Sequence, residues 1–251
     1  MYTPGTCFWG ILGGGRSMNI ISFEEILKSK IHFDNLLSRC GVRIVGQDEI
    51  HKEYKLISDL NKIISDPVKG QEFIRFYNKD GAIDFALFDL TVISYIIPHI
   101  SLCSVSVIRK KIKNILKIST PVNENFENNI ARNTLFELLL YSYLKSVGIS
   151  AELHEPNPDI LVKIQDRNYF IQCKRIFSLN EGAIRSNVLS GLRQLNNDLN
   201  KLEDNNYGII ALSVERRFTQ GNKKMIATTE KSAKLELDNN LRYIAGNYGH
   251  F

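Results

Sequence analysis

Three short pieces within residues 133–175 decide the fold: NTLFELLL at 133–140, PD at 158–159 and QCK at 172–174. The first piece has helical spacing, and Glu137 is the only polar residue in its apolar run at 135–140. A carboxylate in such a run is costly to bury unless a metal or a polar partner receives it. We therefore expect Glu137 to have a metal ion or another partner beside it.

Asp159 is predicted to meet the third piece across a β-hairpin. A turn at 165–168 between strands at 159–164 and 169–176 places Asp159 opposite Lys174 and Leu161 opposite Gln172. Because side chains alternate between the two faces of a strand, Asp159, Gln172 and Lys174 share one face. An acid, an amide and an amine are therefore expected to converge at one edge of the hairpin.

This ordered set resembles the core of the PD-(D/E)xK nuclease superfamily, the fold of many restriction enzymes and Holliday-junction resolvases. The resemblance covers about residues 124–215 and rests on the acid-bearing helix, the Pro-Asp step and the short hairpin. Gln172 stands where Asp or Glu is usual, a variant that resembles the Gln-x-Lys of Mrr-type restriction endonucleases. The resemblance implies an α/β fold, with a restriction-endonuclease-like αβββαβ core, a mixed sheet and a helical N-terminal domain.

The resemblance also implies a divalent cation, magnesium (Mg²⁺) or Mn²⁺. Hard cations take oxygen ligands, so Asp159 is the first expected ligand, supported by Glu137, the Gln172 amide oxygen and the backbone carbonyl of Cys173. Lys174 is expected to act on the attacking water and to stabilise charge on the phosphate. The expected catalytic set is therefore Glu137, Asp159, Gln172 and Lys174.

Basic residues mark the expected nucleic-acid contacts. Arg175, Arg185, Arg193 and Gln194 follow the hairpin at a distance that suits a phosphate-facing surface. The net charge of +5 and the pI near 8.9 favour a polyanionic partner, of which DNA is the favoured one. A further basic run, RKKIK at 109–113, fits a solvated helix face better than a phosphate contact.

The chain divides into a flexible leader at 1–18, a helical N-terminal domain at 19–120 and a nuclease-like domain at 121–251. Residues 120–123, TPVN, mark the boundary between the last two parts. The elements expected after it are a helix at 124–147, strands at 151–154, 159–164 and 169–176, a helix at 181–202, a strand at 207–214 and a helix at 231–244.

Residues 90–108 carry no full charge, which raises the question of a membrane span. Pro98, His99 and four serines dilute the stretch, so two core helices broken at Pro98 are the better explanation. The four cysteines form no Cys-x-x-Cys pair, and residues 1–17 lack a basic leader region. We therefore expect a cytoplasmic protein with no membrane partner.

The leading expectation is a metal-dependent nuclease that acts on DNA. One alternative is a catalytically inactive nucleic-acid-binding protein with the same fold, which Gln172 makes conceivable. Another is an interaction protein that works through its helical domain, with Asp159 and Lys174 forming a plain cross-strand ion pair and Glu137 capping a buried group. Because each chain has one site, cleavage of both strands would favour a homodimer.

Overall fold

The computed structural model describes residues 22–43, 48–78, 81–118, 129–155, 158–176, 181–199 and 206–213. Within these ranges the chain forms seven helices and a four-stranded mixed sheet, which confirms the mixed α/β class. The predicted leader at 1–18 and the predicted helix at 231–244 lie outside the described residues. The elements are α1 (Phe23–Arg39), α2 (Glu49–Ile63), α3 (Pro67–Tyr77), α4 (Ala82–Ile100), α5 (Val105–Ile115), α6 (Ile130–Ser146), β1 (Ser150–Leu153), β2 (Ile160–Ile164), β3 (Arg167–Arg175), α7 (Glu181–Leu199) and β4 (Asn206–Ser213).

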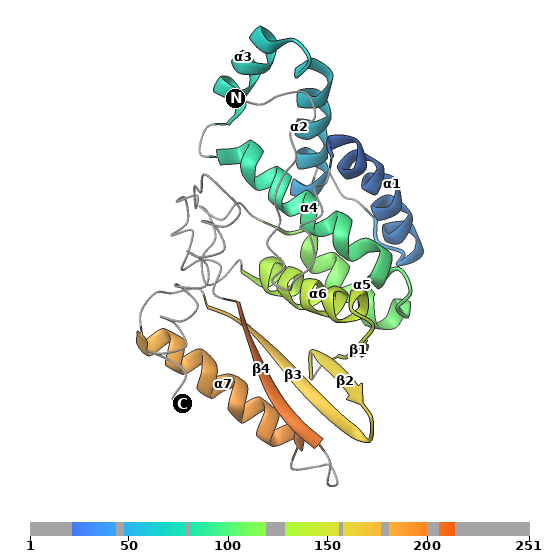
Figure 1. Cartoon of the computed structure of the whole chain (residues 1–251), viewed down its shortest axis with the longest axis vertical. Helices are drawn as coiled ribbons and strands as arrows, with labels where there is room; N and C mark the ends of the chain where they lie inside the picture. The colour runs from blue at the N-terminus through green and yellow to red at the C-terminus, as the bar shows by residue number, and fades with distance from the viewer. Residues whose placement is uncertain are drawn as a thin grey trace.

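The elements form layers that are visible in Figure 1. The helices α1 to α5 lie on one side of α6, the sheet lies on the other side of α6, and α7 covers the outer face of the sheet. The helical N-terminal part and the sheet-containing part were both expected from the sequence. Their elements follow the chain order α6-β1-β2-β3-α7-β4 after the first five helices.

Short polar side chains start the first three helices. Ser22 accepts a hydrogen bond from the Glu25 backbone N–H at 3.2 Å, and the Glu25 carboxylate accepts one from the Ser22 N–H at 2.7 Å, so α1 begins with a capping box. Asp48 caps α2 and Asp66 caps α3, where Pro67 takes the first helical position. These helix starts are therefore determined by local sequence.

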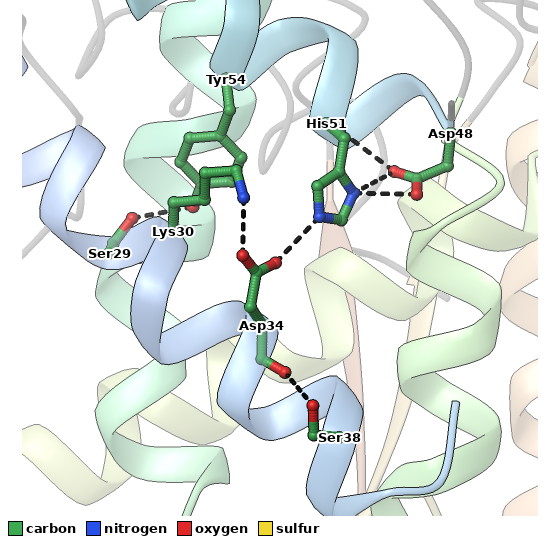
Figure 2. A network of polar contacts seen from close by, with 7 residues as sticks. All are labelled: Ser29, Lys30, Asp34, Ser38, Asp48, His51 and Tyr54. Atoms are coloured by element: carbon green, nitrogen blue, oxygen red, sulfur yellow. Dashed lines mark hydrogen bonds and ion pairs between the residues drawn. The ribbon is translucent and has the colours of Figure 1, made fainter. Parts of the chain in front are cut away.

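A polar network joins α1 to α2 (Figure 2). The Nε2 atom of His51 lies 2.9 Å from Oδ1 of Asp34 in α1, and its Nδ1 atom lies 2.8 Å from Oδ2 of Asp48, the cap of α2. The hydroxyls of Ser29 and Tyr54 make a second link at 2.8 Å. These bonds fix how the first two helices lie against each other.

The apolar helix α4 packs against α1, α2 and α6. It is long and apolar enough to cross a membrane, but 56% of that stretch is buried inside the fold, as in a core helix. Pro98 lies in its last turn, and the helix ends only at Ile100. The expected break at Pro98 is therefore wrong: the proline removes one intrahelical bond, that to the Ser94 carbonyl, and the break falls at 101–104 instead.

The helix α6 is buried from two sides, since it contacts α4 and α5 on one side and β1 and β3 on the other. Arg132 of α6 donates two hydrogen bonds, of 2.9 and 2.7 Å, to the carboxylate of Asp89 in α4, and both side chains are buried. One hydrophobic cluster extends from Phe23 of α1 to Ile171 of β3. The two predicted domains therefore share a core, and the expected boundary at 120–123 lies outside the described residues.

The sheet has the strand order β1-β2-β3-β4. The first three strands are antiparallel, while β4 pairs with β3 in parallel. A parallel pair needs a crossover connection, and α7 supplies it. Gly208 of β4 lets α7 approach closely, because a Cβ there would lie 3.1 Å from a methyl of Leu199 and 3.2 Å from one of Leu195. The sheet is thus covered by α6 on one face and α7 on the other.

The register of the hairpin differs from the predicted one by two residues. Ile164 pairs with Arg167 and Ile160 with Ile171, so the turn consists of residues 165–166 and not 165–168. The parallel pairing of β3 with β4 begins at Asn168 and keeps that residue extended. Because side chains alternate along a strand, a shift of two residues leaves every one on its predicted face.

Candidate functional site

Asp159 lies directly before β2 and is held against β3. Its Oδ2 accepts hydrogen bonds from Gln172 Nε2 at 2.6 Å and from the backbone N–H of Cys173 at 2.7 Å. The Cys173 N–H is available for this bond because the β2–β3 ladder ends at the pair Ile160 and Ile171. The structure thus brings the acid and the amide together, with Gln172 opposite the acid where we expected Lys174.

Lys174 lies on the face of β3 that α7 covers. Its Nζ donates a hydrogen bond of 2.5 Å to Oε1 of Gln194 in α7. Gly191 of α7 packs close to the lysine stem, since a Cβ at that position would lie in van der Waals contact with Lys174 Cε, at 3.4 Å. Gln194, which we expected to contact nucleic acid, therefore orients the Lys174 ammonium.

Glu137 has a cationic partner from a distant part of the chain. Lys111 of α5 donates a short hydrogen bond to Glu137 Oε1, and its Nζ lies 3.3 Å from Oε1 of Glu155. Only 4% of the Lys111 side chain and 11% of the Glu137 side chain are exposed. The neighbouring Lys110 bonds to the other Glu155 oxygen at 3.0 Å. The expectation of a wholly solvated basic run at 109–113 is therefore wrong for Lys111.

The pKa values of this cluster follow from one ammonium shared between two acids. Burial raises the pKa of Glu137 to about 7, although Lys111 opposes the shift. Burial by itself lowers the pKa of Lys111, but Glu137 and Glu155 together outweigh it and raise that pKa. The lysine is thus held as a cation, while each carboxylate receives only part of its stabilisation.

Asp159 lies within electrostatic reach of lysines from two parts of the fold. Burial raises its pKa, and the Cys173 N–H, Lys111 and Lys174 each act in the opposite direction. The carboxylate of Asp159 also raises the pKa of Glu137. The four expected catalytic residues are therefore grouped around Asp159, together with Lys111.

The oxygen atoms beside Asp159 fit a hard cation. Gln172 is 4% exposed, and its Oε1 has no hydrogen-bond partner in the part of the chain that the structure describes. The orientation of this amide is set by Asp159, because only Nε2 can donate to a carboxylate. A buried amide oxygen without a partner is costly, so this atom is suited to receive a ligand.

The Cys173 carbonyl completes the set of oxygens. The N–H and C=O of one strand residue point to the same edge, so this carbonyl faces the side from which its N–H reaches Asp159. In the described residues no three His, Cys, Asp or Glu side chains are grouped closely enough to hold a metal. A metal site here would therefore combine Asp159 with the amide oxygen of Gln172 and the Cys173 carbonyl.

The predicted nucleic-acid residues fall into two groups. Arg185 and Arg193 are exposed on α7 and accessible to a partner. Arg175 is only 9% exposed, and its charge acts on Asp89 of α4. It lies on the opposite face of β3 from Lys174, as strand alternation requires. Arg175 therefore does not lie on the expected phosphate-facing surface.

Sequence reasoning did not single out Lys111 or Glu155 as members of this cluster. Lys111 lies three residues after Ile108 and four before Ile115, which places it on the buried apolar stripe of α5. A lone cation on such a stripe is the same kind of signal as Glu137 in α6. Glu155 offers no comparable signal, because it follows β1 outside regular structure.

Comparisons of the chain with protein-family models, with curated proteins and with solved structures give no match.

Proposed function

We propose that this chain is a divalent-metal-dependent nuclease that hydrolyses phosphodiester bonds in DNA. The observation that carries the proposal is the buried Gln172 amide, which donates to Asp159 through Nε2 while Oε1 has no partner in the described residues. A purely structural glutamine would be expected to satisfy both ends. An oxygen left unpaired beside a carboxylate and a lysine favours a ligand-binding role.

The fold supports the same proposal. The order α6-β1-β2-β3-α7-β4, with three antiparallel strands and a fourth strand parallel to β3, is the αβββαβ arrangement that the PD-(D/E)xK resemblance implies. The candidate residues occupy the elements that the resemblance requires: Glu137 on the first helix, Asp159 before the second strand and Lys174 on the third. We infer a restriction-endonuclease-like core from this agreement.

Each residue of the site has a distinct part in this proposal. Asp159, the Gln172 amide oxygen and the Cys173 carbonyl would hold the cation, which when bound supplies positive charge to the scissile phosphate. Lys174, as an ammonium, would orient the attacking water and stabilise the charge that builds on the phosphate. Gln194 keeps the Lys174 ammonium in place by accepting its hydrogen bond of 2.5 Å.

Glu137 has a supporting part in the proposal. Its bond to Lys111 fixes the carboxylate beside Asp159, so that α5 of the helical part takes part in building the site. This same ion pair favours a second candidate function, in which the fold binds nucleic acid without cleaving it. A carboxylate that already has a buried cation does not require a metal, so the burial of Glu137 is explained without one.

The experiment combines metal titration by calorimetry with cleavage of a labelled DNA duplex. Lys174→Ala should still bind Mg²⁺ or Mn²⁺, while its cleavage rate should fall by about 100-fold or more, the scale of a positioned proton-transfer or charge-stabilising group. Asp159→Asn should lose both metal binding and cleavage. Gln172→Glu should keep or increase the affinity for magnesium, and Gln172→Leu should weaken it.

The matched control is Lys163→Ala, which removes a lysine from the same hairpin. Lys163 is exposed and pairs with Glu152 at 3.1 Å, away from Asp159. The cleavage rate of the Lys163→Ala variant should equal that of the parent. If Lys174→Ala cleaves as well as Lys163→Ala, or if the parent binds no divalent cation at millimolar concentration, the nuclease proposal fails and the binding function takes its place.

A further inference from the structure

A groove with a basic lining lies between the end of α1 and the exposed side of α5. Its volume is about 510 Å³. It is lined by Gly41, Val42, Arg43, Asp48, Lys113, Leu116 and Lys117. Three of these side chains are cationic and exposed, and the acid Asp48 is bonded to His51 and to the start of α2. We call this feature the α5 groove.

The cations of the α5 groove continue along one side of α5. Arg109, Lys110 and Lys113 are exposed at spacings that keep them on neighbouring positions of the helix surface, and the exposed Lys117 follows in the turn after α5. Among the described residues, Arg43, Lys113 and Lys117 have no acidic partner within salt-bridge distance. Cations grouped on a concave surface favour the binding of a polyanion.

The dipole of α5 does not account for this arrangement. A helix C-terminus favours cations in its last turn, which explains Lys113 in part. Arg109 lies in the first half of α5, however, and Arg43 follows the end of α1 on a different segment. The positive charge therefore belongs to the groove and not to one helix end.

The α5 groove lies on the same helix as the candidate site. Lys110, three residues before Lys113, bonds to Glu155, and the next residue, Lys111, bonds to Glu137. The rise of a helix places Arg109 and Lys113, both within α5, about 6 Å apart along the axis. This spacing covers about two phosphates of one DNA strand, at about 3.4 Å of duplex axis for each.

We propose that the α5 groove binds the phosphate backbone of the DNA duplex that flanks the cleaved bond. This inference rests on the proposed nuclease function and assigns a substrate-binding role to the helical part of the chain. Phosphate contacts of this kind position a duplex without reading its sequence.

The test measures binding of the full chain to a fluorescent 20-base-pair duplex in EDTA, at salt concentrations from about 50 to 200 mM. The variant Lys113→Gln/Lys117→Gln should reduce the slope of log K against log salt by about two and weaken binding by about eightfold per lysine at 0.1 M salt. The matched control is Lys62→Gln/Lys69→Gln, which removes two exposed lysines, with side chains 69% and 70% exposed, from α2 and α3. This control should bind with the slope of the parent.

The outcomes separate the two proposals. If the groove variant and the control have the same slope, the groove inference is overturned while cleavage by the parent still supports the nuclease function. If the groove variant lowers the slope but the parent shows no metal-dependent cleavage, the groove binds DNA and the nuclease function is overturned. Failure of the parent to bind the duplex at 50 mM salt overturns the groove inference, and the cleavage assay then decides the nuclease function.

Discussion

Replacement of Lys111 by Met tests whether the helical part completes the candidate site. The substitution keeps an unbranched stem of similar length but removes the ammonium that Glu137 and Glu155 share. Glu155 keeps its bond to Lys110, and 28% of its side chain is exposed. The loss therefore falls mainly on Glu137, whose side chain is 11% exposed.

The expected loss can be bounded from the geometry. Removal of one partner from a buried ion pair costs about 3–5 kcal/mol, because the other charge stays buried without a counterion. The pKa of Glu137 is already about 7, so the carboxyl group can take up a proton, which limits the cost. We therefore expect Lys111→Met to lower the free energy of unfolding by about 2–3 kcal/mol at pH 8.

The assay is urea unfolding followed by far-ultraviolet circular dichroism, in EDTA at pH 8. The double variant Lys111→Met/Glu137→Met should be within about 1 kcal/mol of the parent, because an apolar pair of similar volume replaces both charges. The control Lys110→Met removes a lysine whose side chain is 69% exposed, so its cost should stay below about 1 kcal/mol. Equal losses for Lys111→Met and Lys110→Met, or losses that simply add in the double variant, would refute the buried-pair argument.

Three further predictions follow from other contacts. The fragment 121–251 should show no cooperative urea transition, because it lacks the α4 and α5 partners of its buried charges; a cooperative transition would show an independent core. Arg132→Met should lower the free energy of unfolding by about 3–5 kcal/mol, since it strands a buried carboxylate, and a loss below about 1 kcal/mol in urea unfolding would contradict this. Burial raises the pKa of Asp34, but Lys30 and His51 outweigh it and lower that pKa, so its stabilisation is present above about pH 4 and is lost as the pH falls further. Asp34→Asn should therefore lose less thermal stability than the parent between about pH 5 and pH 3, and equal losses would contradict the network.

Features that depend on neighbours in the chain were predictable. The stripe of apolar residues predicted a helix at 181–202, close to the observed α7, and the apolar run at 207–214 predicted a strand close to β4. The predicted register was wrong by two residues, but Asp159, Gln172 and Lys174 still share one face. Side chains alternate along a strand with a period of two, so only an odd shift exchanges the faces.

Features that depend on distant parts of the chain were not predictable from these patterns. The partner of Glu137 is 26 residues away in α5, and the partner of Arg132 is 43 residues away in α4. Helical periodicity shows which side of each helix is buried, but it does not show which other helix covers that side. The packing of α6 between two layers decided both pairs and joined the two expected domains through one core.

The hairpin shows the same division between local pattern and tertiary structure. The residues at 165–168 permit either a two-residue or a four-residue turn, and pairing of Asn168 with Asn206 of β4 selects the shorter one. That choice places Gln172, and not Lys174, against Asp159. Periodicity is a property of adjacent residues and can be read along the chain, whereas the register and the ionic partners arise only when strands and helices far apart in sequence pack together.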